Sequence, residues 1–228
     1  MFISFISQKG GTGKSTLSIH IAALMARSGC NTLLIDADPQ ASTMAWLACR
    51  ARQGYRSIPG LTVMAISNGT ITDQLPQLAR SYGCIIIDGP PGGDRTTRDV
   101  VLASDLVLVP VGLSGFDVWA GDSISHTIEQ LRPVQQRASK QPLDWYYIIS
   151  KKNRTLAGKS ILKALEKKGN PLLDSQISQR ACFVESTSQG LTIFETEPAA
   201  SKASREILAL GDELQTLIRQ RQQRKNAA

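Results

Sequence analysis

The chain has 228 residues, of which 42% are hydrophobic and 20% are charged, a balance that excludes an extended disordered protein and is ordinary for one globular domain. Its net charge of +7 lies entirely in residues 137–228, where 16 basic residues face 9 acidic ones, whereas residues 1–136 hold ten of each. A basic region on an otherwise neutral protein favours a polyanionic partner, either nucleic acid or an anionic membrane surface. A solvated lysine-rich surface is the alternative.

No apolar run approaches the roughly 18 residues that a membrane span requires, and the first expected strand begins at Phe2. We therefore expect a cytoplasmic protein without a signal peptide or membrane span. The cysteines are Cys30, Cys49, Cys84 and Cys182, and they form no C-x-x-C pair. With His20 and His126 equally isolated, neither a zinc site nor a redox motif is indicated.

Short β-branched runs alternate with amphipathic patterns along the chain. The expected strands are Phe2–Ser7, Thr32–Ile35, Leu61–Ile66, Cys84–Ile87, Leu106–Val111 and Trp145–Ile149. Several of them are apolar without alternation, as expected when helices cover both faces of a parallel sheet. The pattern predicts an α/β fold with a doubly wound, mostly parallel sheet and helices on both faces.

The expected helices lie between and after these strands. One helix follows the first strand and stops at Gly29, and the others cover about 42–50, 70–80, 116–131, 156–168 and 201–221. We expect residues 1–219 to form a single domain. Residues 220–228 are rich in Gln and Arg and are expected to form a basic, flexible tail.

The first strand leads into a glycine-rich turn with the sequence Gln8-Lys9-Gly10-Gly11-Thr12-Gly13-Lys14-Ser15-Thr16. In the order strand, turn, helix, such a P-loop lets backbone N–H groups converge on phosphate at a helix N-terminus. Lys14 is expected to reach the β- and γ-phosphates, Ser15 to ligate Mg²⁺, and Thr16 to donate near the α-phosphate. The predicted ligands of ATP are Lys9, Gly10, Gly11, Thr12, Gly13, Lys14, Ser15 and Thr16.

The loop departs from G-x-x-x-x-G-K-[ST] at its first position, which is Gln8, and Lys9 follows as a second cation. With this K-G-G-x-G-K-[ST] pattern the chain resembles the deviant Walker A ATPases, among them the ParA partition ATPases, MinD and the nitrogenase iron protein. The resemblance implies a P-loop NTPase fold and a dimer that shares nucleotide. It also implies that Lys9 acts in trans, on the nucleotide of the partner subunit.

Two carboxylates, Asp36 and Asp38, close the second expected strand in the sequence Asp36-Ala37-Asp38-Pro39-Gln40. Their alternation puts both on one side of the chain, facing a crevice at the carboxyl ends of the strands. D-x-D-P-Q resembles the ParA subgroup. That resemblance makes Asp38 the candidate that orients the attacking water, and Lys9 and Lys14 are the other expected catalytic residues. Asp36 is expected to support the magnesium shell. The alternative for Asp38 is that it caps the next helix.

A third acidic candidate ends the strand Cys84–Ile87, in the form of a Walker B motif. Asp88 is expected to hold Mg²⁺ directly or through water, together with Ser15 and Asp36. Where the family usually has threonine this chain has Gly89, so a hydroxyl contact is missing. The loop that follows, Pro90 to Gly93, is expected to sense the γ-phosphate.

The resemblance extends over nearly the whole chain. Val109 to Asp117 resembles the P-x-x-x-S-x-x-D stretch of the family, and Ile177 to Glu195 with Pro198 resembles its C-terminal segment. Lys202 falls where ParA-like proteins carry a basic residue for non-specific DNA binding, and Arg180 is the second candidate. Such contacts to phosphates bind DNA without reading its bases.

These features predict a ParA-like ATPase for plasmid or chromosome partition, with ATP and Mg²⁺ as cofactors and weak intrinsic hydrolysis. Its expected partners are a second subunit when ATP is bound, non-specific DNA of the nucleoid, and a ParB-like adaptor that stimulates hydrolysis. Because the chain starts just before the P-loop, we expect the short plasmid-type form without an N-terminal DNA-binding domain.

The main alternative is a MinD-like membrane-associated positioning ATPase. Membrane docking needs an apolar face as well as cations, and only the terminal alanines are apolar after Ile218. An iron–sulfur protein of the nitrogenase type needs cysteines near the Walker B loop, and none lies between Cys84 and Cys182. A small-molecule enzyme with the same fold stays open, because a fold alone does not specify function.

Overall fold

The computed structural model describes residues 1–66, 71–139, 142–152, 155–167, 169 and 171–227. Thr70, Lys168 and Ala228, which the sequence analysis placed in helices or in the tail, lie outside the described residues. The strands are β1 (Phe2–Ser7), β2 (Thr32–Asp36), β3 (Leu61–Ala65), β4 (Cys84–Pro91), β5 (Leu106–Val111), β6 (Asp144–Lys152) and β7 (Leu172–Ser178). They form one sheet in the order β3-β2-β4-β1-β5-β6-β7, and every pairing is parallel, so the predicted doubly wound parallel sheet is confirmed.

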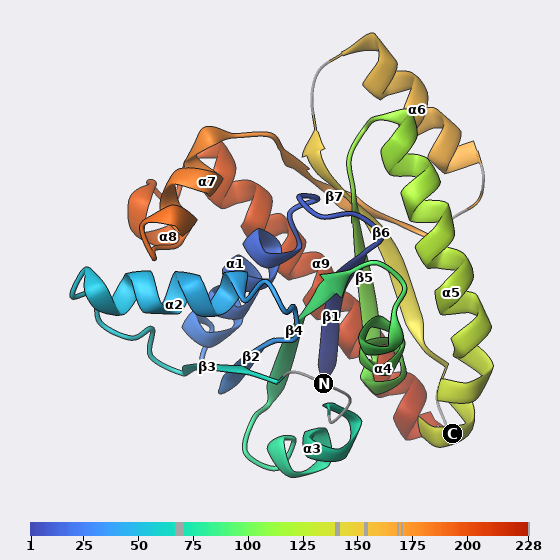
Figure 1. Ribbon diagram of the computed structural model, residues 1–228, viewed down its shortest axis with the longest axis horizontal. Coiled ribbons are helices and arrows are strands. Elements are labelled where there is room, and N and C mark those ends of the chain that lie inside the picture. Colours follow the sequence, from blue (N-terminus) through green and yellow to red (C-terminus); the bar gives the residue numbers. More distant parts are fainter. Residues whose placement is uncertain (67–70, 140–141, 153–154, 168, 170, 228) are drawn as a thin grey trace.

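Helices cover both faces of this sheet (Figure 1). The helices are α1 (Lys14–Arg27), α2 (Ser42–Arg52), α3 (Ile71–Leu78), α4 (Arg95–Ala103), α5 (Gly115–Ser139), α6 (Leu156–Lys167), α7 (Ala181–Ser188), α8 (Ile193–Thr196) and α9 (Lys202–Ala227). Successive strand residues point to opposite faces. Leu34 accordingly packs with α1 and α9, while its neighbours Leu33 and Ile35 pack with α3, α4 and α5.

Every expected strand is present, but β7 and the short helices α4, α7 and α8 were not foreseen. β7 is an edge strand in which only Leu173 and Ile177 are buried, so its sequence lacks the continuous apolar run of the central strands. α4 starts with a side-chain cap, in which Asp94 accepts the N–H of Thr97 at 2.9 Å. An Asp-x-x-Thr sequence before the pair Val100-Val101 was the available signal for this helix.

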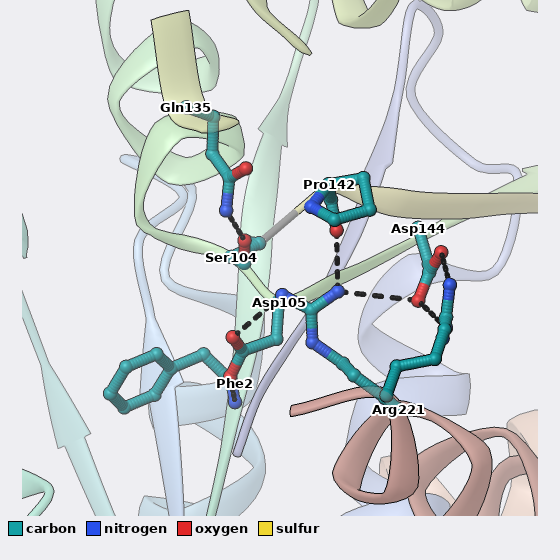
Figure 2. Close-up of polar contacts among 8 residues, drawn as sticks. Phe2, Ser104, Asp105, Gln135, Pro142, Asp144 and Arg221 are labelled. Carbon is teal, nitrogen blue, oxygen red and sulfur yellow. Dashed lines mark hydrogen bonds and ion pairs between the residues drawn. The ribbon is translucent and has the colours of Figure 1, made fainter. Parts of the chain in front are cut away.

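The segment expected to form a flexible tail is helical in the described residues, because α9 continues to Ala227. Arg221 anchors this part of the helix: its side chain is buried and lies 3.2 Å from carboxylate oxygens of both Asp105 and Asp144. It also donates to the carbonyl of Pro142 at 2.6 Å. Figure 2 shows the guanidinium lying between these three acceptors at the amino-terminal ends of β5 and β6.

The carboxylate of Asp105 also connects α9 to the first strand. Its Oδ2 accepts the backbone N–H of Phe2 at 2.8 Å, while its Oδ1 faces Arg221 (Figure 2). Arg224 adds a second cation beside Asp144, at 2.5 Å. Two basic residues of the segment that composition assigned to a flexible tail, buried Arg221 and exposed Arg224, therefore pair with carboxylates at the sheet and hold α9 to it.

We predict that Arg221→Met lowers the free energy of unfolding by about 3 kcal/mol, because Asp105 then loses its compensating charge inside the fold. Urea denaturation followed by circular dichroism measures this change. Arg219 is exposed on the same helix, so Arg219→Met is the matched control and should change the stability by less than about 0.5 kcal/mol. Equally small effects for both variants would contradict the anchoring role of Arg221.

Candidate functional site

The P-loop, residues 8–16, connects the carboxyl end of the central strand β1 to helix α1. Gly11 and Gly13 have φ values of +75° and +98°, which place the backbone in the left-handed region that glycine adopts without strain. In the described part of the chain, the backbone N–H groups of Gly10, Gly11 and Gly13 make no backbone hydrogen bond. The loop therefore presents unpaired donors at the N-terminus of α1, an arrangement that binds anions.

Lys14 and Ser7 join the loop to the end of β1. Lys14 Nζ donates to Ser7 Oγ at 3.3 Å, and the hydroxyl of Thr12 donates to the same oxygen at 2.9 Å. Burial lowers the pKa of Lys14, whereas the charges of Asp88 and Asp38 oppose this effect. These two carboxylates therefore favour the charged ammonium that phosphate binding requires.

Asp88 lies at the centre of the site, fully buried near the end of β4. Burial raises the pKa of Asp88 to about 7, although the hydroxyls of Ser15 and Thr43 and the charge of Lys14 act in the opposite direction. Thr43 donates to Oδ2 at 2.8 Å, while Oδ1 has no hydrogen-bond partner with ordinary geometry. A buried carboxylate with an unused oxygen is costly to keep ionised unless a cation or donor approaches it.

The residues present fit a magnesium ion. Mg²⁺ prefers oxygen ligands and is usually held by one or two carboxylates, hydroxyls and substrate phosphates rather than by an all-protein cage. The unused Oδ1 of Asp88 and the nearby hydroxyl of Ser15 supply such donors. The described residues contain no cluster of three or more His, Cys, Asp or Glu side chains that could hold a metal alone.

Asp36 and Asp38 lie beside this centre, as expected, but they make different contacts. Asp36 is the parallel partner of Asp88 in the neighbouring strand, and its two oxygens accept the N–H groups of Met44 at 3.0 Å and Asp38 at 3.1 Å. These contacts hold the first turn of α2 and the loop before it, so the structure gives Asp36 a positioning role. Its part in a magnesium shell stays a prediction. Asp38 is half-buried and accepts the N–H of Gln40 at 2.9 Å.

A cavity of about 670 Å³ opens beside the P-loop, in the size range of small-molecule sites. Its polar end contains Lys14, Ser15, Thr16 and Asp38. Its other end is lined by Ile19, Ala45, Trp46, Cys49, Val184, Thr187 and Ser188. The motifs identified the phosphate end, whereas the remaining residues come from α1, α2 and α7 and carry no motif that names them.

Helix α2, which forms part of the cavity wall, is held by contacts to α8 and to the segment just before it. Arg50 pairs with Glu195 through two bonds of 2.7 and 3.1 Å, and it also donates to the carbonyl of Gly190. Trp46 Nε1 donates to the carbonyl of Leu191 at 3.0 Å. Bidentate Arg–carboxylate pairs fix orientation as well as distance, so these contacts hold the open end of the cavity in shape.

Lys9 lies outside this cavity. Its Nζ is 3.6 Å from Asp117 Oδ1 and 5.3 Å from the centre of the Phe116 ring. Asp117 is itself held by Ser114, whose hydroxyl donates to it at 2.5 Å at the start of α5. The S-x-x-D sequence noted above thus begins a helix and places a carboxylate beside Lys9.

Gly89 occupies a position at which a side chain has no room. A Cβ atom there would lie 2.7 Å from Cγ2 of Ile6 and 3.0 Å from the carbonyl oxygen of Phe5. The pairing of β1 with β4 shifts register between Phe5 and Ser7, which brings the two backbones together at this point. The local packing of this chain therefore leaves no room for the threonine that the family usually carries at this position.

The two predicted DNA-binding residues are brought together. Arg180 and Lys202 line a groove of about 1160 Å³ between β7 and the start of α9, and Lys152 and Arg205 line it as well. Arg180 is paired with Glu206 at 2.6 Å, whereas Lys202 and Arg205 are exposed. Neither Lys152 nor Arg205 was singled out from the sequence, because only the fold places them beside Lys202.

His20 connects the helix of the P-loop to α8. The ring is fully buried; its Nδ1 donates to the carbonyl of Thr16 at 2.6 Å, and its Nε2 accepts the N–H of Ile193 at 3.0 Å. This pair of contacts requires the neutral ring. Burial lowers the pKa of His20 to about 4, although Thr16 and Glu195 act in the opposite direction.

Because the folded-state pKa of His20 lies below 6.5, the folded form binds its proton less readily than the unfolded chain does. Its contribution to stability is therefore complete above pH 6.5 and is lost as the pH falls toward 4. We predict that His20→Gln removes a pH dependence of about 2 kcal/mol between neutral pH and about pH 5. Urea titrations of both proteins across this range measure it; parallel pH profiles would contradict the prediction.

Comparisons with known proteins agree with this geometry. The family of CobQ/CobB/MinD/ParA nucleotide-binding domains matches residues 3–193. The protein McdA of Halothiobacillus neapolitanus, which maintains carboxysome distribution, is 26% identical over 87% of this chain and 89% of its own. The chromosome-partitioning ATPase Soj of Thermus thermophilus is 27% identical over 57% of this chain, a match that spans 62% of Soj.

Solved structures show the same fold. A plasmid partition protein of Borrelia burgdorferi bound to AMPPNP has a TM-score of 0.71 at 20% identity, over 94% of this chain and 98% of its own. The cell division ATPase MinD of Pyrococcus furiosus has a TM-score of 0.73 at 18% identity, over 95% of this chain and 98% of its own. The chain therefore belongs to the CobQ/CobB/MinD/ParA family of nucleotide-binding domains, as its P-loop sequence indicated.

Proposed function

We propose that this chain is a ParA-like partition ATPase that binds ATP and Mg²⁺, dimerises on ATP, binds DNA without sequence preference and hydrolyses ATP slowly. A ParB-like adaptor would stimulate hydrolysis and so release the DNA. The observation that carries the proposal is the separation of the two P-loop lysines: Lys14 is buried in the nucleotide cavity, whereas Lys9 lies outside it beside Asp117. Such a position suits a lysine that serves the nucleotide of a second subunit.

The proposed hydrolysis uses the carboxylates in separate roles. Asp88 and Ser15 would hold Mg²⁺, which when bound neutralises the phosphate charge, and Lys14 would bind the terminal phosphates. Asp38 lines the cavity near Lys14 without any contact to a cationic partner in the described residues. Its Oδ2 is therefore available to orient a water molecule toward the terminal phosphate.

We predict that Asp38→Ala binds ATP as tightly as the parent protein but hydrolyses it at least about a hundredfold more slowly, because the water loses its orienting base. The variant should accumulate as an ATP-bound dimer in size-exclusion chromatography with light scattering. Asp73→Ala, which removes an exposed carboxylate from α3, is the control. Turnover by Asp38→Ala at the rate of the parent would remove Asp38 from this role.

DNA binding is assigned to the groove between β7 and α9. Exposed Lys202 and Arg205 would contact phosphates there, and Lys152 lines the same groove. Arg180 was predicted to bind DNA together with Lys202. Because Glu206 already pairs with its guanidinium, we expect Arg180 to contribute less to DNA binding than the exposed Lys202 and Arg205. Contacts of this kind supply affinity and salt sensitivity without base recognition.

We predict that the double variant Lys202→Ala/Arg205→Ala weakens ATP-dependent binding to DNA of any sequence. It should reduce the slope of log affinity against log salt by about 2 units, because each of the two cations neutralises one phosphate. Fluorescence anisotropy with a labelled duplex measures this at several salt concentrations. Lys159→Ala/Lys163→Ala removes the same charge from exposed sites on α6 and should leave the slope unchanged.

The second candidate is a MinD-like membrane ATPase, because MinD shares the fold. The end of α9 does not favour it: Arg221 is buried, and residues 222–226 are exposed Gln, Arg, Lys and Asn without an apolar face. Among the described residues no helix has the length and apolar character to cross a bilayer. ATP-dependent binding to anionic vesicles, with no binding to DNA, would decide for this candidate and against partition.

A further inference from the structure

The end of β6 makes two successive contacts with the P-loop that no sequence motif indicated. Ser150 donates its hydroxyl to the carbonyl of Thr12 at 2.5 Å, and Lys151 donates its ammonium group to the carbonyl of Gly11. Both residues belong to a strand that lies two positions from β1 in the sheet. They are the only contacts that these two carbonyls make in the described part of the chain.

These contacts determine which way the loop donors point. In a trans peptide the carbonyl of one residue and the N–H of the next point in opposite directions. With the carbonyls of Gly11 and Thr12 turned toward β6, the N–H groups of Thr12 and Gly13 are turned away from it. The N–H of Gly13 has no backbone acceptor in the described residues, so β6 holds the loop in a conformation that leaves this donor for an anion.

The backbone of Lys151 is strained, with φ at +53°, a conformation that residues other than glycine, asparagine and aspartate seldom adopt. The pairing of β6 with β7 is also irregular between Ile149 and Lys152. This local conformation allows Lys151 to line the nucleotide cavity, whereas the next residue, Lys152, lines the groove between β7 and α9. Strain at a ligand cavity is commonly kept for function rather than for stability.

We propose that Lys151 is a nucleotide-binding residue of this chain: its ammonium group fixes the Gly11 carbonyl of the P-loop and adds a positive charge to the cavity that receives a nucleoside di- or triphosphate. Lys9, by contrast, is held outside the cavity by Asp117. Lys14 and Lys151 are thus the two lysines of one subunit that line its own nucleotide cavity among the described residues. The inference rests on the proposed binding of nucleotide at the P-loop.

The test compares the affinity of purified variants for MANT-ADP and for MANT-labelled non-hydrolysable ATP in the presence of Mg²⁺. Lys151→Asn is the main variant, because asparagine tolerates the left-handed backbone while it lacks the charge. We expect its affinity to fall about tenfold, because the variant loses both a positive charge in the cavity and the charge-assisted bond that orients the Gly11 carbonyl. Its melting temperature without nucleotide should stay close to that of the parent, since relief of the backbone strain offsets the lost contact to the Gly11 carbonyl.

Two further proteins separate charge from structure. Lys151→Arg keeps the charge and the donor, so its affinity should lie close to that of the parent. Lys163→Gln removes an exposed lysine from α6 and should bind nucleotide as the parent does. Rising NaCl should reduce the difference between the parent and Lys151→Asn, because salt screens the charge of an exposed ammonium group.

The outcomes are distinct. If the parent binds neither nucleotide, the proposed function fails. If the parent binds and Lys151→Asn binds equally well, the assignment of Lys151 is overturned while the P-loop site stands. A loss of affinity in Lys151→Asn that Lys151→Arg shares in full, and that salt does not change, would also overturn it, because the effect would then not arise from the charge.

Discussion

The attraction between two buried groups of opposite charge, Lys14 and Asp88, is the constraint on which the site depends. Lys14 begins α1 and Asp88 lies in the central strand β4, and burial lowers the pKa of the lysine and raises that of the aspartate. Each favours the charged form of the other, and neither charge would be stable there alone. The flanking hydroxyls of Ser7 and Thr43 complete this arrangement. Without ligands, Lys14 lacks the phosphate that it would bind and Asp88 lacks the divalent cation that it would bind. This arrangement favours binding phosphate and cation together.

Helices and turns from distant parts of the chain keep this centre in place. His20 bridges α1 and α8, Arg50 and Trp46 fasten α2 to the segment before α8, and Ser150 with Lys151 holds the P-loop from the side of β6. None of these residues belongs to a recognised motif. They act on the orientation of the motif residues, so their loss should change how well the site is formed before nucleotide binds.

The sequence predicted those parts of the structure that rest on local pattern. Continuous apolar runs marked the central strands, and the order strand, glycine turn, helix located the phosphate end of the site. It did not reveal β7, which is an edge strand with a mostly polar sequence, or the helical end of the chain, where composition suggested a flexible tail. Arg221 looks like a solvated cation until the fold brings Asp105 and Asp144 beside it. Lys151 was missed for the same reason, because its partner is a backbone carbonyl far away in the chain.

The contacts of Asp105 bear on how the chain folds during its synthesis. This carboxylate binds the backbone N–H of Phe2 in β1 and the guanidinium of Arg221 in α9. The ribosome therefore synthesises its two partners at very different times. Until α9 has left the ribosome, the apolar face of the sheet that packs against Ile207, Leu210 and Leu214 stays open. Such long-range closure is slow compared with local helix formation. The nascent chain therefore passes through a stage with an uncovered sheet face, the kind of surface that chaperones bind.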